Sequence, residues 1–465
     1  MQSIHYIFQW NYAVYGLHLY GKDAVYIIYL CYLCNYNSIN AKIMDKNVIK
    51  QIILWQQEFV GKVKLQGRNI SLEENANYVL VGIRRAGKSY MLYQKIQNLV
   101  EQGHSLEEIL FINFEDERIT DIRKEELHLI LEAYREMFSH QPIIFLDEIQ
   151  NVEGWEHFAR RLADEKYRVY ITGSNAHMLS REISSTLGGR YLTKEIHPFS
   201  FEEYLEYRHV HLTKFWELSP IKNDVLRLFS DYFYYGGLSE VFNMQDKKSW
   251  LQSLYQKILY SDIVIRKGVR NERSLRLLIR KLADSVMQPT AIKRLQNILQ
   301  GDGTKIARET IASYLDYLHE SFLTFSISCF TDSITERETI KKHYFYDNGI
   351  LNLFLFQPET KLLENIVAIQ LYKKYGEDLY YYNKNMEVDF CVPKDGLLVQ
   401  VSYRMTEDAT RNREISALQK VGKFLNAKKC MIITYDQEET IPSAELGMDI
   451  EVVPVYKFLL DEEKY

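Results

Sequence analysis

The sequence predicts an α/β protein whose first half is built on a parallel β-sheet. Residues 78–81, 109–114 and 142–146 are short apolar runs, which are typical of strands buried on both faces of a sheet. The segment 90–100 follows the first run and has apolar residues at helical spacing. Buried strands that alternate with helices indicate an open parallel sheet.

A phosphate-binding loop joins the first strand to its helix. The pattern Gly-x-x-x-x-Gly-Lys-Ser begins at Gly82 and ends at Ser89. Its glycines let backbone N–H groups face phosphate oxygens at the amino end of a helix, where the helix dipole favours anions. We expect Lys88 to contact the β- and γ-phosphates and Ser89 to be a ligand of Mg²⁺. The residues predicted to bind the nucleotide are Gly82, Arg84, Arg85, Ala86, Gly87, Lys88 and Ser89.

Carboxylates follow the next two predicted strands. Glu115 and Asp116 come after the second strand, and Asp147 and Glu148 after the third. Ligand-facing residues of open α/β sheets lie at such carboxyl ends. An apolar strand that ends in Asp-Glu is the Walker B pattern, so we expect Asp147 to hold Mg²⁺ through water and Glu148 to act as general base. Together with the loop, these acids predict an ATPase or GTPase.

Two further residues are candidates for contact with the transferred phosphate. Asn175 follows a fourth strand at residues 168–172 and would contact the γ-phosphate or the attacking water; the alternative is a simple turn at the strand end. Arg190 follows two glycines and would stabilise phosphate charge in cis or in trans. A solvated surface arginine is the alternative for Arg190.

The combination of motifs resembles the prokaryotic AAA-type ATPases. The resemblance rests on the phosphate loop, on residues 145–156, 172–175 and 197–204, and on Arg190 with its preceding glycines. More narrowly, the chain is similar to the group in which this ATPase domain is joined to a C-terminal domain of unknown function, DUF4143. The resemblance implies that the nucleotide is ATP. The sequence also contains no Asn-Lys-x-Asp guanine motif, which favours ATP over GTP.

The chain is expected to divide into five parts. These are an extension of the reading frame (1–43), a helical segment (44–76), the AAA-type domain (77–205), a helical or winged-helix region (206–330) and a DUF4143-type nuclease-like domain (331–465). Residues 1–43 are dense in tyrosine, so we expect Met44 to be the translational start; a membrane-associating or disordered tail is the alternative. The predicted apolar face of the helical segment is Ile49, Ile52, Ile53, Leu54, Phe59 and Val60.

Composition limits the setting and the partners. The net charge is −5, so no global basic field indicates nucleic acid, although a local patch is compatible with it. The apolar run 24–34 is shorter than the roughly 18 to 20 residues that span a bilayer, so stable membrane insertion is not expected. Five scattered cysteines indicate a reduced, cytoplasmic protein. No second pair of cysteines or histidines follows Cys31 and Cys34 at zinc spacing, so a zinc site is not expected there.

Two helices in the middle of the chain predict a winged helix. They cover residues 289–299 and 306–318 and flank a turn that contains Gly301 and Gly303. The second helix would enter a DNA major groove. Lys305 and Arg308 favour that role, but Glu309, Asp316 and Glu320 lie on the same helix, so a structural or protein-binding role is the alternative.

The C-terminal part resembles a restriction-endonuclease-like α+β domain. Glu364, Glu387 and Asp389 are placed as in the metal site of that fold. The last strand of such a site supplies an acid and a lysine, and here those positions are Gln400 and Ser402. We therefore expect the three acids to be remnants of a site without nuclease activity, in a domain used for binding or oligomerisation.

The function predicted from the sequence is Mg²⁺-dependent binding and hydrolysis of ATP. Two alternatives come from other classes, namely an ATP-gated DNA-binding module and a regulator without enzyme activity that binds a protein. DNA, a protein partner and a second copy of the chain are therefore left open as partners.

Overall fold

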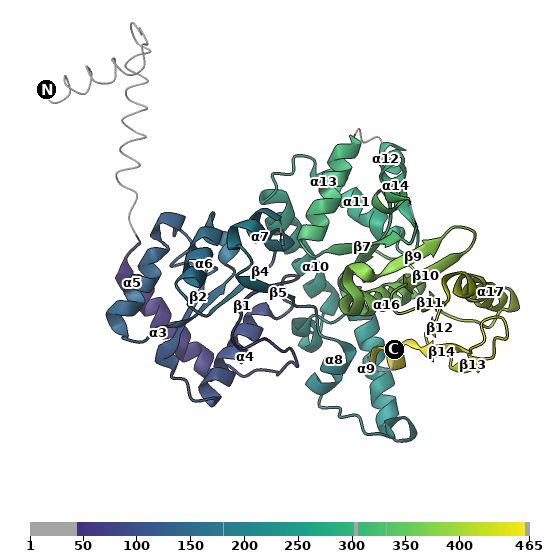
Figure 1. Cartoon of the computed structure of the whole chain (residues 1–465), viewed down its shortest axis with the longest axis horizontal. Coiled ribbons are helices and arrows are strands. Elements are labelled where there is room, and N and C mark those ends of the chain that lie inside the picture. Colours follow the sequence, from purple (N-terminus) through teal and green to yellow (C-terminus); the bar gives the residue numbers. More distant parts are fainter. Residues whose placement is uncertain (1–43, 180, 302–305, 332, 461–465) are drawn as a thin grey trace, which may run out of the picture.

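The computed structural model describes residues 44–460 apart from 180, 302–305 and 332. Residues 1–43, with Cys31 and Cys34, lie outside the described residues, as do Gly303 and Lys305. Within the described ranges, no helix combines the length and apolar character that crossing a bilayer requires. Figure 1 shows a parallel sheet with its helices at one end of the molecule and a larger mixed sheet at the other.

The first half of the described chain contains the predicted parallel sheet. Its strands are arranged in the order β2-β3-β4-β1-β5, and all neighbours pair in parallel. The bounds are β1 (Asn77–Val81), β2 (Ile109–Asn113), β3 (Ile143–Asp147), β4 (Val169–Gly173) and β5 (Tyr191–Glu195). Because β3, β4 and β1 are neighbours, the segments that follow them meet at one edge of the sheet. The α/β fold predicted for this half is confirmed.

Helices surround this sheet (Figure 1). They are α3 (Lys46–Lys62), α4 (Lys88–Glu101), α5 (His128–Met137), α6 (Trp155–Asp164) and α7 (Arg181–Leu187), and α8 (Phe201–Tyr207) follows β5. The Asp45 side chain caps α3 by accepting a hydrogen bond from the Asn47 N–H, and α3 packs on β2 and α5. Of the predicted apolar residues, Ile49, Ile52, Ile53 and Val60 are buried, whereas Leu54 is 51% exposed and Phe59 is 42% exposed.

The middle of the chain is a run of helices that leads into a small antiparallel sheet. The helices are α9 (Ile221–Tyr235), α10 (Lys247–Lys257), the π-helical segment η7 (Ile258–Ile265) and α11 (Glu272–Asp284). Then come β6 (Thr290–Ala291), α12 (Ile292–Gly301), α13 (Arg308–Glu320), β7 (Thr324–Cys329), α14 (Ile334–Thr339) and β8 (Ile340–Phe345). Strand β8 pairs antiparallel with both β6 and β7.

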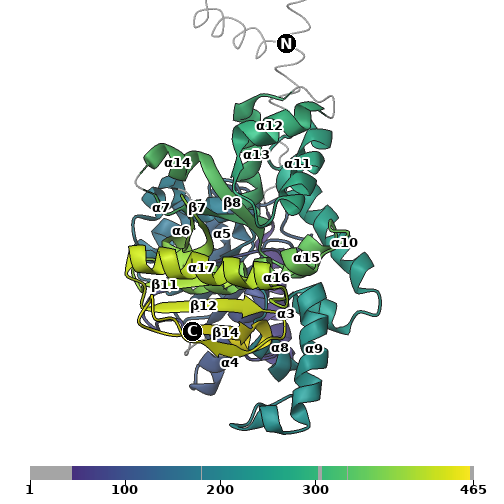
Figure 2. The same ribbon diagram turned by 90° about the vertical axis from the view of Figure 1, so that its right-hand side faces the viewer.

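The last part continues the same sheet instead of forming a separate one. Strand β9 pairs in parallel with β7, which gives one nine-stranded sheet in the order β13-β14-β12-β11-β10-β9-β7-β8-β6. The elements are α15 (Asn348–Asn352), α16 (Glu359–Tyr375), β9 (Tyr380–Asn383), β10 (Glu387–Val392), β11 (Leu397–Val401), α17 (Asp408–Leu425), β12 (Lys429–Thr434), β13 (Glu439–Ile441), β14 (Ile450–Pro454) and α18 (Val455–Leu460). Helix α17 lies along β10, β11 and β12 (Figure 2).

The boundary expected between residues 330 and 331 falls inside this sheet. It separates β7 from β8, although Thr324 to Ser328 of β7 pair with Lys341 to Phe345 of β8. Contacts also join the last part to α9, because Asn348 and Asn352 donate side-chain hydrogen bonds to the carbonyls of Phe233 and Tyr234. The two regions predicted as separate domains therefore share one sheet and one of the two hydrophobic clusters of the described chain.

Candidate functional site

The loop between β1 and α4 has the backbone that a phosphate-binding loop requires. Gly82 has a φ of 149°, and a Cβ there would lie 2.2 Å from the Ile196 carbonyl oxygen. Gly87 has a φ of 95° and precedes the first residue of α4. Other residues adopt such positive φ values with strain, so glycine is required at both ends of the loop. The helix begins directly at the loop, so its unpaired N–H groups face the same space.

Lys88 and Ser89 are held by the loop and by the neighbouring strand. The Lys88 ammonium is almost fully buried and donates hydrogen bonds to the carbonyls of Gly82 (3.0 Å) and Ile83 (3.1 Å). Burial lowers the pKa of Lys88, although the nearby carboxylates oppose this shift. The Ser89 hydroxyl donates to Oδ1 of Asp147 at 3.0 Å. The loop and the end of β3 therefore meet as predicted.

Asp147 provides the oxygen ligands that a hard cation prefers. It is 1% exposed, and the hydroxyls of Thr172 and Ser89 both donate to its Oδ1. Burial and the charge of Glu148 raise the pKa of Asp147 to about 7, against the effect of these hydroxyls. Carboxylate and hydroxyl oxygens 3.0 Å apart form a donor set that fits Mg²⁺.

Glu148 is held close to Lys88 by residues from two elements. Its Oε1 lies 3.8 Å from the Lys88 Nζ, and its Oε2 accepts hydrogen bonds from Gln150 and from the Ser174 hydroxyl (3.1 Å). Burial opposes ionisation, but Lys88 and these donors outweigh it, so the pKa of Glu148 is below the ordinary value. Glu148 has a φ of 54°, and its N–H donates to Thr172 Oγ1 at 2.9 Å. The strand end thus fixes an ionised carboxylate beside the loop.

Both arginines of the loop contact acids from the second half of the chain. Arg84 forms two hydrogen bonds with Asp262 of η7, at 2.9 and 3.1 Å, and one with Glu115 at 2.9 Å. Arg85 pairs with Glu240, and its guanidinium lies 5.4 Å from the Trp250 ring centroid. No local pattern in the sequence predicts that Asp262 and Glu240 pair with these arginines, because they lie more than 150 positions from their partners.

Another buried arginine, Arg68, holds the loop by hydrogen bonds. Arg68 donates to the carbonyls of Ala86 and His197, both at 3.1 Å, and forms a bidentate pair with Glu203. Its guanidinium lies 4.7 Å from the Phe199 ring centroid. Arg68 lies outside any recognisable motif, so this role could not be predicted from the sequence.

These groups surround a cavity of about 550 Å³. Seven predicted residues line it, namely Arg84, Arg85, Gly87, Lys88, Ser89, Asp147 and Glu148. Residues that the prediction did not include complete the wall, among them Lys64, Gln66, Tyr90, Tyr207, Asn243 and Lys257. Gly82 and Ala86 shape the loop but do not line the cavity. Charged groups for phosphate and aromatic side chains thus lie around one space.

Two further predicted residues, Asn175 and Arg190, also lie outside the lining of this cavity. Asn175 is buried after β4, and its neighbour Ser174 is the residue that contacts Glu148. Arg190 precedes β5 and forms a hydrogen bond with Asp164 at 2.5 Å. It lies beside Asn77 at the amino end of β1, about 16 Å from the loop at the rise of a β-strand. The structure therefore does not support a role for Arg190 in cis, and a role in trans stays a prediction.

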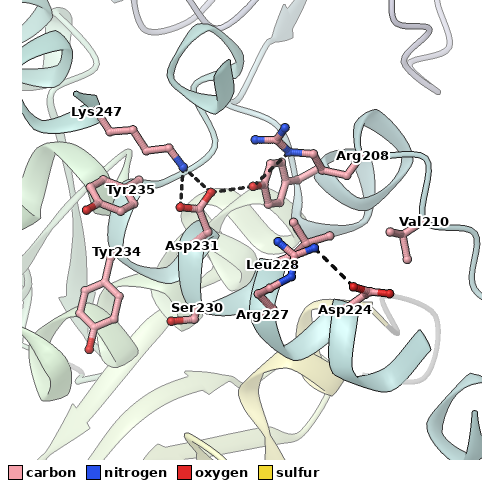
Figure 3. A pocket seen from close by; sticks show the side chains of 11 residues that line it. Arg208, Val210, Asp224, Arg227, Leu228, Ser230, Asp231, Tyr234, Tyr235 and Lys247 are labelled. Atoms are coloured by element: carbon pink, nitrogen blue, oxygen red, sulfur yellow. Dashed lines mark hydrogen bonds and ion pairs between the residues drawn. The ribbon is translucent and has the colours of Figure 1, made fainter. Parts of the chain in front are cut away.

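A second cavity, of about 740 Å³, is lined by residues of α8, α9 and α10 (Figure 3). Its charged side chains satisfy one another. Asp231 accepts hydrogen bonds from Lys247 and from the Tyr204 hydroxyl, and Arg208 donates to Tyr204 and to the Phe242 carbonyl. This network explains the position of the polar groups without a ligand. The cavity at the loop, where the catalytic residue types meet, is therefore the candidate site.

The acids expected as remnants of a nuclease site surround a lysine. The Lys342 ammonium, on β8, lies 3.0 Å from Glu387 Oε1, 3.0 Å from Asp389 Oδ1 and 3.5 Å from Glu364 Oε1. Tyr344 also donates to Glu364 at 2.7 Å. Burial disfavours the charge of Lys342, but Glu364, Asp389 and Glu387 outweigh it and raise its pKa. Lys342 therefore fills the space among the carboxylates.

We expect Asp262→Asn to destabilise the fold by about 1–3 kcal/mol, because the Arg84 guanidinium then loses its charged partner in a buried setting. Glu240→Gln is the matched control: the Arg85–Glu240 pair is exposed and screened, so the expected effect is below about 1 kcal/mol. The midpoint of urea unfolding measures both. Equal midpoints for the two variants would show that the Arg84 pair has no special weight.

Comparisons with known proteins agree with the geometry of the first half. Residues 74–205 match the family model of an AAA domain, and residues 226–361 match a domain of unknown function, DUF8612. The prediction of a DUF4143 domain was wrong, since DUF8612 is the matching model. Among solved structures, the Walker-type ATPase PABY2304 of Pyrococcus abyssi is 15% identical with a TM-score of 0.41, over 68% of this chain and 97% of that one. The Aeropyrum pernix ORC1 protein, solved in complex with DNA, is 14% identical with a TM-score of 0.32, over 64% and 89% of the two chains.

Two relatives match nearly the whole protein. The uncharacterized protein MJ1544 of Methanocaldococcus jannaschii is 33% identical over 90% of this chain and 97% of its own length. An uncharacterized protein of Haemophilus influenzae is 31% identical over 82% of this chain and 94% of its own length. The chain therefore belongs to the family of AAA-domain proteins that includes these archaeal and bacterial relatives.

Proposed function

We propose that the protein binds ATP with Mg²⁺ and hydrolyses it to ADP and phosphate. One observation carries this proposal: the Ser89 hydroxyl and Asp147 Oδ1 lie 3.0 Å apart in a cavity that also holds Lys88 and Glu148. These are the side chains that phosphoryl transfer requires, and they come in pairs from two motifs, Lys88 and Ser89 from the phosphate loop and Asp147 and Glu148 from the end of β3. The AAA-domain match over residues 74–205 supports the same chemistry.

Each residue has a separate role in this proposal. Lys88 exchanges its hydrogen bonds to the Gly82 and Ile83 carbonyls for bonds to phosphate oxygens. Ser89 and Asp147 hold Mg²⁺, which when bound supplies positive charge for the phosphate oxygens. Glu148 orients the attacking water and accepts its proton, and the lowered pKa of Glu148 keeps the carboxylate ionised for this step.

Lys88→Ala is the direct test of nucleotide binding. The variant loses a buried cation that would form charge-assisted hydrogen bonds with phosphate, each of which contributes about 1.5–3 kcal/mol. We expect the affinity for Mg²⁺-ATP to fall by about 10- to 100-fold or more in isothermal titration calorimetry. Lys95→Ala is the control, because Lys95 lies on the same helix but outside the cavity. Unchanged ATP affinity in Lys88→Ala would contradict the proposal.

For the second half, we propose a winged-helix region joined to a restriction-endonuclease-like fold without nuclease activity. The order α11-β6-α12-α13-β7-α14-β8 supports the first assignment, with α14 between the two strands of the wing, and the order α16-β9-β10-β11-α17-β12 supports the second. Lys342 supports the loss of activity, because its ammonium lies where a metal ion would bind the acids. One observation is in favour of the second candidate function, an ATP-gated DNA-binding module, namely the positive charge of the winged-helix region.

A further inference from the structure

Positive charge is concentrated in one segment of an acidic protein. The described residues 266–301 and 306–308 contain ten lysines and arginines and two aspartates and glutamates, a formal net charge of +8, whereas the whole chain carries −5. The segment forms α11 and α12 and reaches the start of α13. These three helices stand together in both views of the molecule (Figures 1 and 2). We call α11, α12 and the first residue of α13, Arg308, the three-helix lobe.

Most of the cations of the lobe have no acidic partner. Arg276 pairs with Glu272, and Lys267 pairs with Glu320. By contrast, the exposed side chains with no carboxylate of the described chain within ion-pair distance are Arg270, Arg273, Arg280, Lys293, Arg294 and Arg308. Arg294 and Arg308 contact only the neutral side chains of Gln288 and Gln296. Among the described residues, the charge of these six side chains is therefore not compensated by an ion pair.

The positions on α11 suit a repeating anionic partner. Arg273 and Arg280 are seven residues apart, which places them on one face of the helix two turns apart, about 10 Å along its axis. Arg276 lies on the same face between them. Guanidinium groups bind phosphate through two hydrogen bonds at once, which lysine cannot do. A row of arginines thus matches a row of phosphates.

The composition of the lobe distinguishes a duplex from a single strand. Sites for single strands stack bases on aromatic side chains. Residues 266–308 contain no Phe, Tyr or Trp, although 13% of the chain is aromatic. Contact with the phosphate backbone of a duplex needs no stacking and depends on Lys and Arg alone. From these observations we propose that the three-helix lobe binds the phosphate backbone of a nucleic-acid duplex.

The contact differs from the one expected from the sequence, in which α13 reads a major groove. The exposed side chains of α13 after Arg308 include the acids Glu309 and Asp316, which repel phosphate. Another part of α13 packs against β7 and against the segment Ala176–Leu179 that follows β4. Helices α11 and α12 therefore make the contacts, and binding is independent of base sequence because phosphates carry no sequence information.

The test is binding of the full chain to a fluorescein-labelled 20-base-pair DNA duplex, followed by anisotropy at several salt concentrations. We expect the wild-type affinity to fall steeply with salt. The triple variant Arg273→Glu, Arg280→Glu, Arg294→Glu should bind more weakly, with a salt slope smaller by about three. The matched control is Lys394→Glu, Lys420→Glu, Lys423→Glu, which changes the net charge equally at exposed sites after β10 and on α17.

The outcomes separate the proposal from its alternatives. Loss of binding in the first variant with wild-type affinity in the control supports the lobe, and an RNA duplex of the same sequence shows which backbone is preferred. Equal affinity in both variants would overturn the proposal, as would tighter binding of the single strand or of polyglutamate. Thermal unfolding midpoints show whether the variants fold. Because anisotropy measures binding and not turnover, the result does not depend on ATP hydrolysis.

Discussion

Replacing Glu148 with glutamine is expected to lower ATP turnover by about 10²- to 10⁴-fold, the usual contribution of a general base. The amide keeps the size of the side chain and still accepts hydrogen bonds from Gln150 and Ser174, so the cavity keeps its shape. It cannot accept a proton from water. Nucleotide affinity should stay close to the wild-type value, because the Lys88 and Ser89 groups are unchanged.

Single-turnover hydrolysis and ATP binding, measured on the same preparation, separate these two effects. Glu115→Gln is the matched control, since Glu115 lines the same cavity but contacts Arg84 instead of Lys88. We expect its turnover to fall by less than about tenfold. Hydrolysis at the wild-type rate by the Glu148 variant would assign the proton acceptor to another group.

Lys342→Met is expected to destabilise the second half by about 3–5 kcal/mol at neutral pH, because it leaves three carboxylates without their buried cation. Burial already raises the pKa of Glu364 to about 7 even with Lys342 present. Without the ammonium, the pKa of Glu364 in the folded state rises further above its unfolded value. The folded variant then binds more protons than the unfolded one, so its deficit shrinks as the pH falls toward about 5.

Urea unfolding at neutral and mildly acidic pH measures this dependence. The adjacent Lys341 is the control, because its partner Glu338 is 71% exposed and the ion pair is screened. Lys341→Met should change stability by less than about 1 kcal/mol at either pH. If both variants unfold at the same urea concentration, the buried ammonium does not hold the acids together.

The sequence was informative where a function depends on neighbours along the chain. The phosphate loop, the strand ending in Asp147 and Glu148, and the parallel sheet all follow from local patterns of glycine, acids and apolar runs. The sequence was uninformative where partners come from distant elements. Asp262 reaches Arg84 from η7, and no pattern around either residue signals the other.

Some patterns have two physical meanings. The helical period that groups Leu54 and Phe59 with the buried residues of α3 does not decide which apolar side chains meet the core: both are exposed, and Phe59 stacks on Trp55 with ring centroids 5.7 Å apart. In the C-terminal part, Ser402 stands at the position where a nuclease site has its lysine. The lysine that contacts the three acids comes instead from β8. Only the pairing of β7, β8 and β9 brings Lys342 to those acids.

The continuous nine-stranded sheet has a consequence for how this protein can be divided by proteolysis or by gene fission. Cutting the chain after residue 330 would sever the connection between β7 and β8, so that the two fragments would be joined in the sheet by the pairing of β6 and β7 with β8 and β9. Each separated fragment would expose unpaired strand edges, which promote aggregation. Residues 290–454 thus form one cooperative unit, and its loss or inheritance during evolution is expected to be all or none.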